Sequence, residues 1–219
     1  MKLRDLFVRL FLRKGENLFL AKDIDPALVC VNQGGKYVFL SEIETLENVS
    51  MLTAQGTWGY EDFILLKRKL RINIPSGAVN VVLHEVDMRN VRLDPTCDSI
   101  DFRGLFNFCL NLVTVILPDA TDFEGSISFR NAFQGCSKLR KIYNLATYRR
   151  IFDLRGAFYY CMVLDALELY ADPFPRIDSD TFQRINRDIR ITLFESNCIP
   201  LDWVHLNAEN VRVSKSVVS

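Results

Sequence analysis

The chain has 219 residues, of which 49% are hydrophobic, and its 27 lysines and arginines balance 27 aspartates and glutamates. That apolar content is enough for a large core and excludes a disordered chain. The formal net charge of zero excludes a global attraction to nucleic acid or to an anionic membrane, so we expect no nucleic acid partner.

The N-terminal stretch "MKLRDLFVRLFLRKGEN" places apolar residues at helical spacing and predicts an amphipathic helix. Arg9 interrupts its apolar run and no small-residue cleavage site follows, so we expect no signal peptide. No run is long enough for a membrane span, and we expect a cytoplasmic or virion location with mostly reduced cysteines. The helix either caps the rest of the chain or docks on a partner through Phe7 and Phe11.

The next segment, "ALVCVNQGGKYVFL" over residues 27–40, has an apolar run on either side of Gly34 and Gly35. This pattern predicts a β-hairpin with the two glycines in its turn. Helix and hairpin together form a predicted cap or docking segment over residues 1–59.

Three later phrases repeat one pattern, namely "FRGLFNFCLNLVTVIL" from Phe102, "FRNAFQGCSKLRKIYN" from Phe129 and "LRGAFYYCMVLDALEL" from Leu154. Counted from the inner phenylalanine, apolar residues recur at offsets 0, +3, +6 and +9. The first three offsets suit one face of a helical turn, and +9 suits the inward position of a strand. The period of about 25 residues is typical of a solenoid turn. The positions are Phe106, Cys109, Leu112 and Val115; Phe133, Cys136, Leu139 and Ile142; and Phe158, Cys161, Leu164 and Leu167.

This repeat resembles the BspA-type leucine-rich repeat family over about residues 60–213. The resemblance implies a right-handed coil with one short strand per repeat. The predicted fold class is therefore an α/β repeat solenoid with an N-terminal helix and β-hairpin cap. The predicted domains are the segment 1–59, the leucine-rich-repeat solenoid 60–213 and a tail 214–219.

The repeat places Cys109, Cys136 and Cys161 at one inward position of successive repeats. A small, weakly polar thiol packs well there, so we interpret the three as buried structural cysteines. A disulfide along the stack and a metal site are the less favoured alternatives, because the dihedral angle and the paired ligands they need are not indicated. We expect no metal and no cofactor.

Offsets +8 and +10 point outward from each predicted strand and together form one face of the sheet. Their apolar centre and charged rim are typical of a protein interface, although a solvated sheet face explains them equally well. The candidate partner-binding residues are Arg92, Ile116, Lys141, Tyr143, Glu168 and Arg190.

A second series, Arg103, Arg130 and Arg155, shares one repeat position and precedes Gly104, Asn131 and Gly156. Glycine and asparagine recurring at one position indicate a positive φ angle. The three arginines form a candidate site for an anion or an acidic partner. The alternative is structural ion pairing with Asp101 and Asp153.

The two histidines, His84 and His205, have no nucleophile at a recognisable spacing, and no catalytic residues are predicted. We therefore expect a non-enzymatic protein-protein interaction or structural protein, bound to a partner or to neighbouring subunits. The alternative is a phage virion or other assembly subunit that docks through its N-terminal segment. A bacterial surface adhesin, a role common among proteins of the resembled family, or an enzyme with a pocket near the histidines is less favoured.

Overall fold

The computed structural model describes residues 26–31, 36–46, 48–70, 82–170 and 173–194, and the backbone of residues 211–214. The predicted N-terminal helix with Phe7 and Phe11 lies outside these residues, as do the turn at Gly34 and Gly35 and His205.

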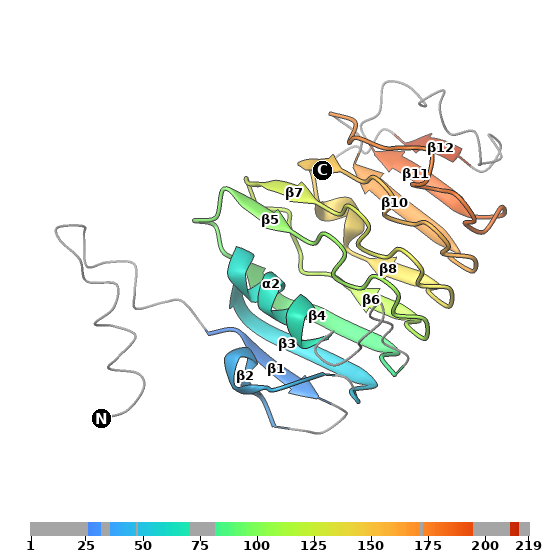
Figure 1. Ribbon diagram of the computed structural model, residues 1–219. Helices are drawn as coiled ribbons and strands as arrows, with labels where there is room; N and C mark the ends of the chain where they lie inside the picture. Colours follow the sequence, from blue (N-terminus) through green and yellow to red (C-terminus); the bar gives the residue numbers. More distant parts are fainter. Residues whose placement is uncertain are drawn as a thin grey trace, which may run out of the picture.

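The largest sheet contains both antiparallel and parallel strands (Figure 1). Its strand order is β2-β1-β3-β4-β6-β8. Strand β1 pairs antiparallel with β2 and with β3, and from β3 onward every pairing is parallel. The strands are β1 (Leu28–Val31), β2 (Val38–Phe39), β3 (Met51–Trp58), β4 (Glu85–Leu93), β6 (Thr114–Ile116) and β8 (Lys141–Tyr143).

Two further sheets of three parallel strands each complete the described architecture (Figure 1). The first comprises β5 (Ser99–Asp101), β7 (Ser126–Ser128) and β9 (Ile151–Asp153). The second comprises β10 (Ala166–Tyr170), β11 (Arg190–Phe194) and β12 (Val211–Ser214). The chain thus passes from β5 to β6 and from β7 to β8, so one repeat contributes to two sheets.

Helix α2 (Tyr60–Lys69) is the one α-helix among the described residues, beside two short 3-10 turns, η1 (Leu40–Glu42) and η2 (Leu145–Thr147). The Asp62 carboxylate accepts a hydrogen bond of 2.9 Å from the Gly59 N–H, which satisfies a free donor at the start of the helix. Phe63 and Leu66 face the core, and the Phe63 ring lies 4.6 Å from that of Phe102. These contacts fix the helix against β5.

The core contains a stack of phenylalanine rings, one from each repeat. Ring centroids are 5.8 Å apart for Phe106 and Phe133, 6.0 Å for Phe133 and Phe158, and 5.8 Å for Phe158 and Phe182. The first three of these side chains are at most 1% exposed, so each removes a large apolar surface from water. The predicted stacking of these phenylalanines is confirmed.

Tight turns, and not helices, carry the stacked phenylalanines. Gly104, Asn131 and Gly156 have φ angles of 58°, 55° and 62°, which confirms the predicted positive φ at this position. Four residues further on, Phe108, Gly135 and Tyr160 are also left-handed, at 58°, 76° and 64°. A right-handed helical turn cannot pass through two such residues. Backbone N–H groups instead donate to the next repeat, as Phe106 does to Ala132 at 2.9 Å.

The predicted fold class, an α/β repeat solenoid with a right-handed leucine-rich-repeat coil, is wrong. The described strands form three separate sheets with mixed pairing, no closed solenoid results, and one helix is present among the described residues. Each central repeat carries two strands, because β5, β7 and β9 precede the phrases from which the repeat was counted. The predicted hairpin pairs antiparallel, but β1 continues the large sheet through β3 and is not a separate cap. The division at residues 59 and 213 stays a prediction.

Candidate partner-binding surfaces

The outward positions of β6 and β8 form a flat surface, here called the Tyr143 face and defined as Thr114, Ile116, Lys141 and Tyr143. The parallel register places Thr114 beside Lys141 and Ile116 beside Tyr143. Val115 between them is buried, so the flanking residues point away from the core. Tyr143 is 45% exposed and Ile116 is half-buried, which leaves a partly open apolar pair on strands that also carry the exposed Lys141.

Glu168 and Arg190 lie on the neighbouring sheet, where both are exposed. Register places Arg190 beside Ala166 and Glu168 beside Thr192, so the two charged residues are two residues apart along the strands. Strands β8 and β10 belong to different sheets, but the Asp165 N–H donates to the Arg140 carbonyl at 3.1 Å. That hydrogen bond keeps β10 next to the Tyr143 face.

The repeat count implies that Arg92 belongs to the same face as Ile116 and Tyr143. The structure places Arg92 elsewhere. Strand β4 pairs with β6 through Glu85 to Asp87, so Asp87 is the neighbour of Ile116. The register between β3 and β4 shifts after Thr53, and this irregularity interrupts the alternation along β4. Arg92 is exposed further along the strand, where its backbone forms a parallel bridge with Asp119.

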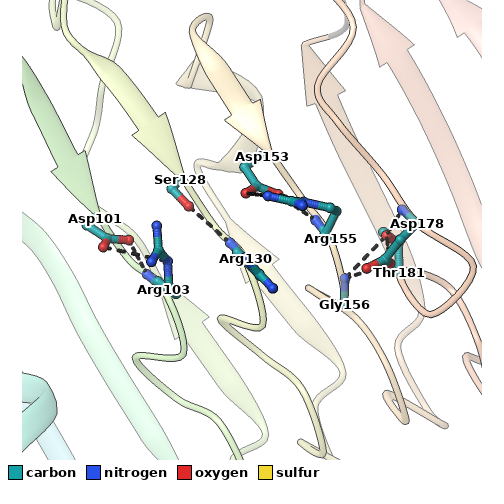
Figure 2. A network of polar contacts seen from close by, with 9 residues as sticks. All are labelled: Asp101, Arg103, Ser128, Arg130, Asp153, Arg155, Gly156, Asp178 and Thr181. Carbon is teal, nitrogen blue, oxygen red and sulfur yellow. Dashed lines mark hydrogen bonds and ion pairs between the residues drawn. The ribbon is translucent and has the colours of Figure 1, made fainter.

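The arginine row, defined as Arg103, Arg130 and Arg155, follows the strands β5, β7 and β9 (Figure 2). Two residues before each arginine stand Asp101, Ser128 and Asp153, which are paired to one another in the parallel register. The three arginines therefore occupy equivalent places on successive repeats.

Asp153 and Arg155 form a closed ion pair. The guanidinium donates from Nε to Oδ1 at 3.0 Å and from Nη2 to Oδ2 at 2.7 Å, and the Arg155 backbone N–H donates to Oδ1 at 3.1 Å. Burial by itself would raise the pKa of Asp153, but these hydrogen bonds and the charges of Arg155 and Arg130 lower that pKa below its ordinary value. This pair fits the structural alternative for the arginine row.

Asp101 and Arg103 form a looser pair at the other end of the row. The Arg103 backbone N–H donates to Asp101 Oδ1 at 2.8 Å, whereas Nε of Arg103 lies 3.8 Å from Oδ2. The Lys67 ammonium group of α2 donates to the Arg103 carbonyl, which brings a second cation to this end. The Arg103 side chain is 52% exposed and its charge stays largely accessible to solvent.

Arg130, in the middle, has a serine where its neighbours have a carboxylate. The Ser128 hydroxyl accepts a hydrogen bond of 3.4 Å from the Arg130 backbone N–H (Figure 2). Among the described residues, none forms an ion pair with the Arg130 guanidinium. Its charge contributes to lowering the pKa of Asp153, but the hydrogen bonds to that carboxylate come from Arg155.

The row ends in a different arrangement beyond Arg155. The Gly156 N–H donates to Asp178 Oδ1 at 3.0 Å, and the Thr181 hydroxyl donates to the same carboxylate at 2.8 Å (Figure 2). No fourth arginine follows, because position 179, three before Phe182, is a serine. The row of arginines thus ends at Arg155, and the Asp178 carboxylate contacts the following repeat position, Gly156, instead.

The three cysteines of the repeat are buried thiols, and two of them donate a hydrogen bond to the preceding repeat. The Cys136 Sγ–H donates to the Phe106 carbonyl at 3.0 Å, and that of Cys161 donates to the Phe133 carbonyl at 3.2 Å. Burial raises the pKa of both thiols. No disulfide joins the described cysteines, and no cluster of three or more potential metal ligands occurs among the described residues. The structural interpretation of Cys109, Cys136 and Cys161 agrees with this geometry.

Two features of these surfaces were missed at the level of sequence. One is the neutral Ser128 between two aspartates, which aligning the residues upstream of each arginine would have revealed. The other is Phe152, whose side chain is 42% exposed in β9. The register between β7 and β9 shifts between Ile127 and Ser128, so Phe152 has no partner residue in β7. The sequence of such short strands does not indicate where a register shift occurs.

Comparison of the chain with protein-family models, with curated proteins and with solved structures found no match. The resemblance to the BspA-type repeat therefore stays an interpretation of the repeated phrases. In the part of the chain that the structure describes, no helix has both the length and the apolar character for crossing a membrane.

Proposed function

We propose that this chain is a non-enzymatic protein that binds a protein partner, or neighbouring subunits of an assembly, through the Tyr143 face. The observation that supports this proposal is the in-register pair of Ile116 and Tyr143, in which an aromatic ring stays 45% exposed beside a half-buried aliphatic side chain. Aromatic residues at the centre of a flat patch are the usual anchors of protein interfaces.

The rim of this face supports the same proposal. Lys141 lies on the same strand as Tyr143, and Glu168 and Arg190 follow on β10 and β11, so both signs of charge surround the apolar centre. Charged rims add specificity and association rate more than affinity. Most of the binding free energy is therefore expected from Tyr143, with Lys141 setting orientation.

The experiment is an affinity capture with the full chain as bait, followed by titration of the captured protein in purified form. The double variant Lys141→Ala and Tyr143→Ala is compared with the wild type. Met162→Ala is the matched control, because Met162 is also 45% exposed but follows Cys161 in a turn and lies outside the sheets. We expect a partner that wild type and control retain and that the double variant binds at least about tenfold more weakly.

A partner that binds the double variant as tightly as the wild type would overturn the assignment of the Tyr143 face. The unfolding transition of each variant serves as the check on folding. Both substituted side chains are exposed, so the variant is expected to unfold within about 0.5 kcal/mol of the wild type.

A further inference from the structure

The arginine row lies on a different sheet from the Tyr143 face, and its charge balance is uneven. Asp153 holds Arg155 through two side-chain hydrogen bonds, and Asp101 partly neutralises Arg103. At the equivalent place in the middle repeat, Ser128 is neutral and only 2% exposed. The middle repeat therefore has an arginine, Arg130, but no aspartate two residues before it.

The Arg130 guanidinium is able to take up an anion from outside the chain. None of the described residues forms an ion pair with it, and the half-buried side chain follows the end of β7 (Figure 2). A guanidinium presents a planar fork of N–H donors that matches a carboxylate with two parallel hydrogen bonds. Adjacent strands are about 4.8 Å apart, so one carboxylate can also reach the guanidinium of the adjacent Arg103.

An exposed aromatic residue precedes the aspartate at the Arg155 end of this row. Phe152 immediately precedes Asp153 in β9, and its side chain is 42% exposed at the register shift between β7 and β9. Arginine and aromatic residues are enriched together at protein interfaces. A partner that fits this surface brings an apolar side chain for Phe152 in addition to a carboxylate for Arg130.

We propose that the surface formed by Arg103, Arg130 and Phe152 binds an acidic segment of a protein partner, with a carboxylate of that segment on the Arg130 guanidinium. The occupant follows from charge complementarity, because the row offers an uncompensated cation and the neighbouring ring offers an apolar contact. This surface is separate from the Tyr143 face, so this proposal is tested independently of the function proposed above.

The test measures binding of the full chain to a synthetic acidic peptide, acetyl-Glu-Leu-Glu-Leu-Glu-amide, by calorimetric titration at low ionic strength. Two variants remove the uncompensated charge by different routes. Arg130→Gln deletes the cation, and Ser128→Asp supplies the missing carboxylate while every arginine is kept. Arg140→Gln is the control, since it also removes a surface arginine charge but Arg140 precedes β8 in the other sheet.

We expect both variants to weaken peptide binding by about tenfold and the control to leave the affinity unchanged. A double variant, Lys141→Ala with Tyr143→Ala, is expected to bind the peptide like the wild type, which separates this surface from the Tyr143 face. Added salt is expected to weaken binding to the wild type, because exposed charges are screened.

Equal affinity of wild type and Arg130→Gln for the peptide, or no measurable binding to the wild type, would overturn the proposal. Inorganic phosphate that binds as tightly as the peptide and competes with it would also overturn it, in favour of a small-anion site. A peptide with Gln in place of Glu is expected not to bind. If Ser128→Asp does not fold, Arg130→Gln alone decides the result, because its side chain is half-buried and has no ion-pair partner among the described residues.

Discussion

The side-chain oxygen of Asn131 occupies the space into which a side chain on Gly156 would project, since a Cβ on Gly156 would lie 2.2 Å from Asn131 Oδ1. The two residues hold the same left-handed position in successive repeats, with φ angles of 55° and 62°. Gly156→Ala therefore adds both a strained backbone and a steric collision. We expect the free energy of unfolding to fall by at least about 2 kcal/mol, measured by denaturant titration.

A double-mutant cycle separates these two causes. Asn131→Gly removes the colliding oxygen, so Gly156→Ala should cost less in that background, with the left-handed strain of about 1 to 2 kcal/mol remaining. An identical cost of Gly156→Ala in both backgrounds would contradict the contact between the two repeats.

The phenylalanine stack predicts a large effect of truncating its central ring. Phe133 is 0% exposed and lies between Phe106 and Phe158, so Phe133→Ala leaves a cavity that the neighbouring repeats cannot fill. We expect a loss of about 3 to 5 kcal/mol in the free energy of unfolding. Tyr143→Ala is the control on an exposed ring, and a comparable loss there would show that ring size and not burial determines the cost.

The buried thiols predict selective protection from alkylation. Burial raises the pKa of Cys136 and of Cys161, and the thiolate is the reactive form. In the folded protein at about pH 8, iodoacetamide should modify the half-buried Cys97 before either of them, as measured by peptide mass spectrometry. In denaturant all three should react alike, and early modification of Cys136 without denaturant would be inconsistent with its place in the core.

The ion pair of Asp153 and Arg155 predicts a dependence of stability on pH. The pKa of Asp153 is lower in the folded chain than its ordinary value of 3.8, so the pair stabilises the fold above that pH. This contribution is lost as the pH falls through the folded-state pKa. The free energies of unfolding of wild type and Asp153→Asn should differ most near neutral pH and converge as the pH falls below the folded-state pKa of Asp153.

Asp165→Asn supplies the matched control for this measurement. Its carboxylate is 41% exposed and lies 4.0 Å from Arg140, a surface pair that contributes about 0 to 1 kcal/mol. Its difference from the wild type should therefore be small at neutral pH. A difference for Asp153→Asn that stays constant down to acid pH would argue against a charged pair.

The repeated offsets were sufficient to predict which side chains are inside. Phe106, Phe133, Phe158 and the cysteines between them are buried because inward direction depends on local spacing, which the sequence carries directly. The path of the backbone was not predictable in the same way. A left-handed residue is signalled by Gly104 or Asn131, but not by Phe108 or Tyr160, which have the same sign of φ.

The candidate surfaces were likewise predictable where they depend on local spacing and not where they depend on strand register. The neighbourhood of Ile116 and Tyr143 followed from the offsets, because both are counted from phenylalanines in adjacent regular repeats. Arg92 was misplaced, because the long strand β4 shifts its register against β3. Arg130 lacks an ion-pair partner among the described residues because Ser128 lies beside Asp101 and Asp153 in the register of β5, β7 and β9. That register was not predicted, because these three strands were not recognised in the sequence.

The hydrogen bonds between successive turns also determine the order in which the turns unfold locally. The Gly104 N–H donates to Arg130, the Asn131 N–H donates to Arg155, and each turn is thereby held by the turn that follows it in the chain. Amide protons in the middle of this series are covered on both sides, whereas those at its last member have one neighbour. Hydrogen exchange should therefore proceed inward from the outer turns, and the amide of Phe133 should be among the last to exchange.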